Sequence, residues 1–347
     1  MPNLFVYKNL HKLTAGGLLI SLGIIYGDIG TSPLYVFKAI VGDSIITTDL
    51  ILGGLSLIFW TLTLQTTIKY VIVTLRADNK GEGGIFSLFS LVRRRARWLV
   101  IPAMIGGAAL LADGIITPPI TVSSAIEGLG IIKPGLPTVP IVIFIITCLF
   151  IFQQFGTSLV GKAFGPIMFI WFTMMAVLGI SYLIHDPTIL KAINPWYAYH
   201  TLATNPNSFI ILGAVFLCTT GAEALYSDLG HVGRSNIRIS WIYVKTCLLL
   251  NYFGQGVWLL QHQGTKLNGD NPFYELMPEW FLVFGICIAT AAAVIASQAL
   301  ISGSFTLISE AVRLNLWPKV RINYPTNQRG QLYVPSMNWL LWAGCIL

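Results

Sequence analysis

Long apolar runs separated by short polar stretches make up most of the chain from Leu13 onward. Each run approaches the roughly 20 residues that a helix needs to cross a bilayer core. We therefore predict nine membrane-spanning helices, near residues 13–37, 50–75, 99–126, 140–155, 163–184, 208–226, 239–260, 281–308 and 332–347. The first run has no small-residue cleavage site and continues past Pro33, so it is not predicted to be a signal peptide.

The composition supports a membrane protein. Of the 347 residues, 55% are hydrophobic and only 10% are Asp, Glu, Lys or Arg, whereas an ordinary soluble domain carries roughly 25% charged residues. This argues against a soluble enzyme and against a disordered chain. The net charge of +7 does not indicate nucleic-acid binding, because the basic residues lie between apolar runs and form no clustered face. The five cysteines show neither metal-ligand nor disulfide spacing.

Basic residues in the loops predict the orientation. Fifteen of the 21 Lys and Arg residues fall on the same side as the N-terminus and four on the other, while Lys69 and Lys245 lie inside predicted spans. Cytoplasmic loops carry the excess of Lys and Arg, so we expect a multi-pass protein of the cell membrane with a cytoplasmic N-terminus. The basic run at residues 93–97 fits contact with anionic lipid on that side.

Helix-breaking and polar residues interrupt the first span between residues 26 and 35. Two glycines and a proline cannot sustain a regular helix there. The freed backbone carbonyls must be satisfied internally or by a ligand. Asp28 lies in this break beside the hydroxyl groups of Thr31 and Ser32. Such oxygen ligands suit a hard cation; the alternative is a proline kink with Asp28 paired to a neighbouring helix.

Two further spans contain acids at a depth where a charge costs roughly 2.5–3.5 kcal/mol to insert. Asp113 and Thr117 are four residues apart and share a helix face if the turn holds; the alternative is a kink with a neutral Asp113. In the sixth span, Glu223 follows Thr220 and a glycine. A carboxyl buried without a permanent partner can carry a transported proton; the alternative is a Glu223 paired with Lys245 or a backbone donor.

The first and sixth spans are therefore both interrupted and both acidic. Corresponding broken helices five spans apart predict an all-α inverted-repeat secondary transporter with its site at the bilayer midplane. The single domain, residues 1–347, would hold a first repeat at 13–184 and an incomplete second repeat at 208–347. An acid in the break repels a substrate carboxylate, which favours an inorganic cation over an amino acid.

The glycine-rich loop at residues 81–84 allows two interpretations, a gating or coupling turn and an ordinary solvated loop. An enzyme is not expected. No nucleophile–base set and no metal cluster at one depth is evident in the sequence.

Several motifs resemble those of the KUP/HAK/KT family of potassium transporters. In chain order they are GDIGTSPLY at 27–35, RADNKGEGG at 76–84, DGIITP at 113–118, GAEALYSD at 221–228, NYFGQG at 251–256 and IASQ at 295–298. The resemblance implies a LeuT-like fold of the APC superfamily with broken helices one and six. It also implies potassium uptake across the cell membrane together with protons, and no cofactor.

Matched position by position, the resemblance implies which side chains form the site. Asp28 resembles the cation ligand of the first span, Tyr35 an aromatic gate and Glu223 the proton carrier. The full cation-binding set that it implies is Asp28, Thr31, Tyr35, Asp113, Thr117 and Thr220, with Asp28 and Asp113 as the acidic potassium ligands. The implied partners are potassium, protons and the lipid bilayer, and a homodimer is left open.

One departure from the family pattern affects these expectations. Family members have further spans and a cytoplasmic C-terminal domain, whereas this sequence stops inside the ninth predicted span. We therefore expect a C-terminally truncated member whose second repeat lacks its last helix. Two alternatives stay open: a carrier of another cation or of amino acids with the same fold, and a membrane fragment without transport.

Overall fold

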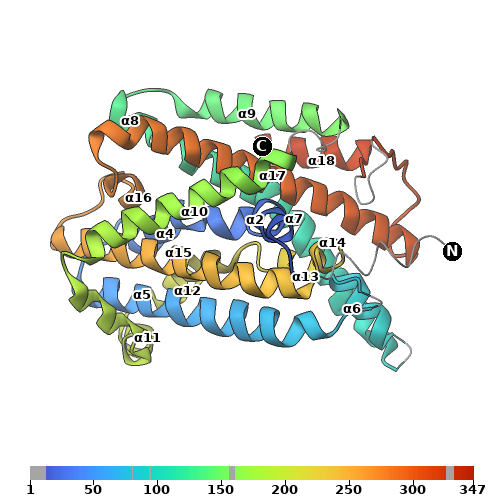
Figure 1. The fold of residues 1–347 in the computed structure, drawn as a ribbon, viewed down its shortest axis with the longest axis horizontal. Coiled ribbons are helices and arrows are strands. Elements are labelled where there is room, and N and C mark those ends of the chain that lie inside the picture. The colour runs from blue at the N-terminus through green and yellow to red at the C-terminus, as the bar shows by residue number, and fades with distance from the viewer. Residues whose placement is uncertain (1–12, 80, 94, 156–160, 326–331) are drawn as a thin grey trace.

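The computed structural model describes residues 13–79, 81–93, 95–155, 161–325 and 332–347. Within these ranges the chain is helical, with two isolated bridges, Asn79–Glu82 and Asn323–Tyr333, and no strands. Most of the long helices run along the longest axis of the molecule (Figure 1). Some of the basic residues that predict the orientation lie outside the described residues: Lys8, Lys12, Lys80, Arg94 and Arg329.

The elements follow one another with short connections. The first half of the chain forms α2 (Ala15–Ile24), α3 (Gly27–Thr31), η1 (Ser32–Leu34), α4 (Val36–Val41), α5 (Thr48–Thr61), η2 (Leu62–Val73), η3 (Thr74–Arg76), α6 (Ile85–Val92), η4 (Arg97–Leu99), α7 (Val100–Ile126), α8 (Leu129–Ile132), α9 (Thr138–Phe152), η5 (Gln153–Phe155) and α10 (Gly161–Leu183). The second half forms η6 (Pro187–Ile193), α11 (Pro195–Thr204), α12 (Ser208–Phe216), η7 (Leu217–Thr219), α13 (Ala224–Ser227), α14 (Leu229–Val232), α15 (Arg234–Gln261), α16 (Pro272–Glu275), α17 (Glu279–Arg313) and α18 (Pro335–Ile346).

Fewer helices qualify as membrane spans than the sequence predicts. By length and composition, six described helices are long and apolar enough to cross a bilayer, and the bent pair of α2 with residues 27–34 makes up to seven. The two predicted spans that are not among these seven are residues 239–260, in α15, and residues 332–347, which contain α18. Helix α15 has 28 residues but buries polar side chains such as Asn251 and Gln255. Helix α18 has 12 residues and reaches Ile346, next to the last residue of the sequence, so its length here does not decide whether it is a span.

The outside of the bundle is apolar. Phe144 of α9 and Phe209 of α12 are 68% and 86% exposed. Ile105 and Ile242 are also more than half exposed. Soluble monomers rarely show extended apolar surface of this kind. Together with the apolar helices, it identifies a multi-pass membrane protein.

Close crossings of small residues hold the central helices together. A Cβ on Gly23 of α2 would lie 2.7 Å from the backbone nitrogen of Gly165 in α10. A Cβ on Gly254 of α15 would lie 2.6 Å from the Cα of Gly179, also in α10. Helix α10 therefore touches α2 and α15 backbone to backbone, as small residues allow in membrane bundles. This packing fixes α2, whose end leads into the site.

Candidate cation site

The first segment bends by 68° between α2 and the helical stretch 27–34. The bend falls at residues 25 and 26, before the glycines, and the residues after it are helical. Our prediction of an irregular stretch over residues 26–35 was therefore wrong in its extent. Pro33 is tolerated because it lies in the first turn of η1, where a helix does not use the missing N–H.

Three acidic side chains from distant parts of the sequence meet beside this bend. One carboxylate oxygen from each of Asp28, Asp113 and Glu223 lies within 4.8 Å of the others. Asp28 belongs to α3, Asp113 to α7, and Glu223 to the turn before α13. The structure thus brings together the three acids that the sequence singled out. Such a group can hold a metal ion.

Asp28 is the most enclosed of the three. It is only 6% exposed, and neither of its carboxylate oxygens has a hydrogen-bond partner among the described residues. The alternative in which Asp28 pairs with a neighbouring helix is therefore not met. The Thr31 hydroxyl donates to the backbone carbonyl of Asp28 at 2.8 Å, so this hydroxyl stabilises the turn that presents the carboxylate.

Asp113 and Thr117 lie on one face of α7, as predicted. The Thr117 hydroxyl donates to Oδ1 of Asp113 at 2.6 Å, and Oδ2 of Asp113 is buried without a partner among the described residues. Helix α7 continues through Pro118 and Pro119 to Ile126. The side chain of Asp113 is therefore held at one oxygen and leaves the other for the acidic cluster.

The sixth segment is interrupted next to Asp28. Thr220 leaves the helical region with ψ 133°, and Gly221 has φ +83°. A Cβ on Gly221 would lie 2.7 Å from Cβ and 3.0 Å from Oδ2 of Asp28. Only glycine fits both this backbone conformation and this contact, so Gly221 brings the two breaks together and places Glu223 at the cluster.

We expect Gly221→Ala to lower the thermal unfolding midpoint of the detergent-purified chain. A left-handed backbone costs a non-glycine residue about 1–2 kcal/mol, and the new methyl group would press on Asp28. Gly213→Ala in α12 is the matched control, because open space surrounds that glycine and alanine favours a helix by about 0.5–1 kcal/mol. Equal unfolding midpoints for the two variants would show that Gly221 is not required at the turn.

For Tyr35 and Thr220, the other two members of the predicted cation-binding set, the structure shows hydrogen bonds outside the acidic cluster. Tyr35 is buried, and its hydroxyl lies 3.4 Å from Oγ of Ser32. Ser32 in turn donates to the Leu217 carbonyl of η7 at 3.1 Å, which links the two interrupted segments a second time. Thr220 is half-buried in the turn, and its backbone N–H donates to the Leu217 carbonyl at 3.3 Å.

Side chains that the sequence analysis did not select satisfy the carbonyls after the bend. Trp171 of α10 donates to the Gly30 carbonyl at 3.0 Å, Gln255 of α15 to that of Pro33 at 3.0 Å, and Asn271 to that of Leu34 at 2.8 Å. These three carbonyls are therefore satisfied internally, one of the two outcomes the sequence allowed. The charge available to a cation comes instead from three carboxylates.

Glu223 does not form the predicted alternative pair with Lys245. The Lys245 ammonium donates to the Thr63 hydroxyl at 3.0 Å. The described residues form two ion pairs, Lys38–Glu127 and Arg234–Asp78, and neither includes Glu223. No cation of the protein thus pairs with Glu223 within the described part of the chain.

The expectation that no metal-binding cluster exists at one depth was wrong. Asp28, Asp113 and Glu223 form such a group, although they are 85 or more positions apart in the sequence. Glu223, predicted only as a proton carrier, also belongs to this group, with a carboxylate oxygen within 4.8 Å of the other two acids. The three acids meet because of the tertiary fold, and their spacing along the sequence does not indicate the cluster.

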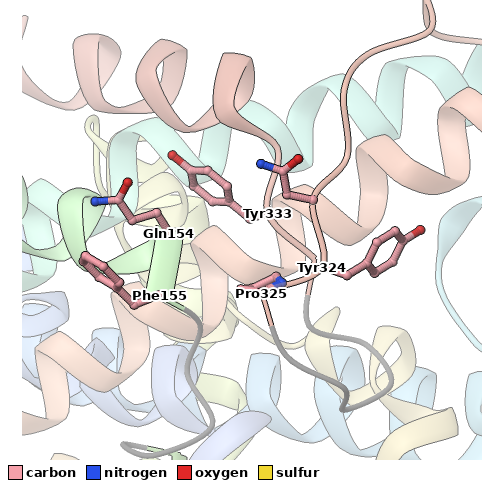
Figure 2. Close-up of a pocket in the computed structure, with 6 residues that line it drawn as sticks. Gln154, Phe155, Tyr324, Pro325 and Tyr333 are labelled. Carbon is pink, nitrogen blue, oxygen red and sulfur yellow. The ribbon is translucent and has the colours of Figure 1, made fainter.

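A separate open pocket of about 370 Å³ lies near η5 (Figure 2). Its lining residues are Gln154, Phe155, Asn323, Tyr324, Pro325 and Tyr333. None is acidic or basic, and none belongs to the acidic cluster. We therefore place the candidate site at the cluster and not in this pocket.

Comparison with known proteins identifies the family. Residues 15–347 match the family model described as "K+ potassium transporter integral membrane domain". The chain belongs to this family. The family is one of membrane transporters without a known cofactor, which agrees with the expectations of no enzyme and no cofactor.

Three relatives share the description "Probable potassium transport system protein Kup". The Cytophaga hutchinsonii protein is 69% identical over 340 residues, covering 96% of this chain and 52% of the relative. The Flavobacterium johnsoniae protein is 65% identical, and the match covers 98% of this chain and 53% of the relative. The Clostridium perfringens protein is 58% identical, and the match covers 98% of this chain and 54% of the relative. The chain thus spans about half the length of the curated relatives it matches.

Proposed function

We propose that the chain takes up potassium across the cell membrane, with the ion bound at the cluster of Asp28, Asp113 and Glu223. The observation that carries the proposal is the convergence of three carboxylates within 4.8 Å. Like charges this close in an apolar surrounding require positive charge from a metal ion, from protons or from both. The names of the relatives supply potassium as the ion.

A cation carrier is favoured over an amino-acid carrier of the same architecture. A bound amino acid would bring its own carboxylate close to three others, and this contact is repulsive. The oxygens of Thr117 and Tyr35 supplement the acids as ligands for a dehydrated ion. The Thr31 hydroxyl belongs to α3, just after the bend, and the Thr220 hydroxyl to the turn after η7, and these two complete the proposed set.

We propose symport with a proton carried by Glu223. This side chain has no cationic partner among the described residues and lies at the start of the short helix α13. A proton and a potassium ion together neutralise more of the negative charge of the three carboxylates than either does alone. Asp28 then remains the permanent ligand, while Glu223 exchanges its proton as access changes.

The orientation and repeats are part of the same proposal. The excess of basic residues in the loops on the N-terminal side supports a cytoplasmic N-terminus. The segments interrupted at residues 25–26 and 220–223 would then correspond in two inverted repeats of a LeuT-like fold, residues 13–184 and 208–347. A site between them lies near the bilayer midplane, away from the headgroups of the lipid.

The membrane potential is sufficient to concentrate the ion. Moving one positive charge inward releases about 2.3 kcal/mol per 100 mV. Because a tenfold gradient corresponds to about 1.4 kcal/mol, this supports accumulation of about 50-fold. A symported proton adds its own gradient, which matters most when external potassium is scarce.

Tracer uptake into proteoliposomes tests the proposal. Vesicles that contain the chain and an inside-negative potential should accumulate labelled rubidium, and excess potassium should suppress the uptake. Excess sodium or alanine should not. Suppression by sodium or alanine would favour the other carrier, and a folded chain without uptake would identify the inactive-fragment alternative.

A further inference from the structure

The loop between η3 and α6 is attached to the sixth segment. Asp78 pairs with Arg234 at the start of α15, with Oδ1 2.9 Å from Nη2. Its other oxygen accepts from the Gly81 N–H at 2.8 Å, so one carboxylate both shapes the loop and binds the partner. The Tyr226 hydroxyl donates to the backbone carbonyl of Ala77. This loop is therefore held against α13 and α15 at these residues, although parts of it remain open to water.

Close packing at two glycines supports the same attachment. A Cβ on Gly83 would overlap the Tyr226 carbonyl oxygen, and a Cβ on Gly230 would overlap the Glu82 carboxylate. The loop thus packs directly against α13 and α14, through its backbone at Gly83 and through the Glu82 side chain at Gly230. Figure 1 places α6, α13 and α14 toward one end of the bundle and α8 and α16 at the other.

The covered part of the sixth segment has a hinge at each end. Two four-residue helices, α13 and α14, lie between Gly221 with φ +83° and Gly233 with φ +84°. Short helices joined through such glycines can rotate as a unit, because few residues must absorb the change in backbone angles. Glu223 belongs to this unit, so its movement would change access to the acidic cluster.

We propose that residues 77–79 and 81–84 form a latch that holds the unit 222–232 closed over one end of the cation pathway, and that the Asp78–Arg234 ion pair is its releasable part. This inference rests on the proposed function for the pathway itself. The two side chains are 32% and 39% exposed. An ion pair so open to water contributes little, and salt screens it. The pair can therefore separate at a small cost in free energy, while the close contacts at Gly83 and Gly230 set the closed position.

Thiol labelling tests the latch without relying on transport. In a cysteine-free background, Leu229→Cys places a probe at a position that is 3% exposed in α14. In detergent, Asp78→Asn and Arg234→Gln should each raise its labelling rate by a charged maleimide about twofold to fivefold. The double variant should match the single ones, because both break the same pair. Gly83→Ala, which displaces the loop sterically, should raise the rate further.

Two controls separate latch opening from unfolding. Lys38→Gln breaks the Lys38–Glu127 pair, which has a similar exposure of 34% and 30%, and should leave the rate unchanged. A single-cysteine chain that retains only the buried Cys218 should stay protected in every variant. The proposal is overturned if the Asp78 and Arg234 variants label at the parent rate, if Lys38→Gln raises the rate equally, or if Cys218 becomes labelled along with the probe.

Discussion

Asp28→Asn is expected to abolish rubidium uptake by proteoliposomes while the chain remains folded. The substitution keeps the shape of the side chain and removes the charge whose two oxygens lack a hydrogen-bond partner among the described residues. Removing one partner from a buried charge pair costs about 3–5 kcal/mol. An effect of this size corresponds to a loss of affinity of at least about 100-fold.

The matched control is Asp43→Asn, an equal change at an exposed aspartate after α4. It should transport rubidium like the parent chain. Asp113→Asn should weaken uptake in the same direction as Asp28→Asn, although Thr117 could still donate to the remaining carbonyl oxygen of the new amide. Uptake by Asp28→Asn at the parent rate would remove Asp28 from the site.

Glu223→Gln is expected to separate cation movement from proton movement. The amide cannot release a proton, so rubidium uptake driven by the membrane potential should no longer respond to an imposed pH gradient. During rubidium uptake by the parent chain, a pH indicator inside the vesicles should report that protons enter together with the cation. The Glu223→Gln variant should take up rubidium without this proton entry, because its amide carries no exchangeable acid proton.

Glu279→Gln is the control for this change, because Glu279 is exposed at the start of α17. It should retain both the response to the pH gradient and the proton entry. If Glu223→Gln retained both as well, another group would carry the proton. If both the parent and the variant ignored the pH gradient, uptake would be uncoupled from protons.

The acids of the site could be found from the sequence because charge is rare in apolar segments. Asp28, Asp113 and Glu223 each stand in a run where a charged residue is costly. The nearby glycines and hydroxyls indicated that the helices there are not simple spans. The resemblance to potassium transporters supplied the ion, which residue types alone do not define. Their meeting within 4.8 Å depends on tertiary packing and could not be read from spacing.

The side chains that support the bend could not be identified in this way. Trp171, Gln255 and Asn271 each donate to a carbonyl near η1, yet they lie more than 130 positions from it in the sequence. For Gln255, the one sequence feature that could have indicated this role is the number of polar residues in α15. Asn251 and Gln255 are buried there and bond to each other at 2.8 Å, a pattern that indicates an interior helix instead of a lipid-facing one.

The boundaries of the interruptions also depend on contacts across the fold. Glycines and a proline predicted irregular backbone at residues 26–35, but the bend occurs just before them. A Cβ on Gly27 would lie 3.0 Å from the Cα of Ala296 in α17. Gly27 therefore serves close helix packing, while the following residues complete short helical turns.

Anomalous diffraction from crystals grown with rubidium in place of potassium tests the central claim most directly. We predict one strong rubidium peak in contact with carboxylate oxygens of Asp28 and Asp113, beside Glu223, and no such peak in crystals of Asp28→Asn. A rubidium peak elsewhere in the bundle, with Asp28 bonded to a lysine or arginine, would contradict the account.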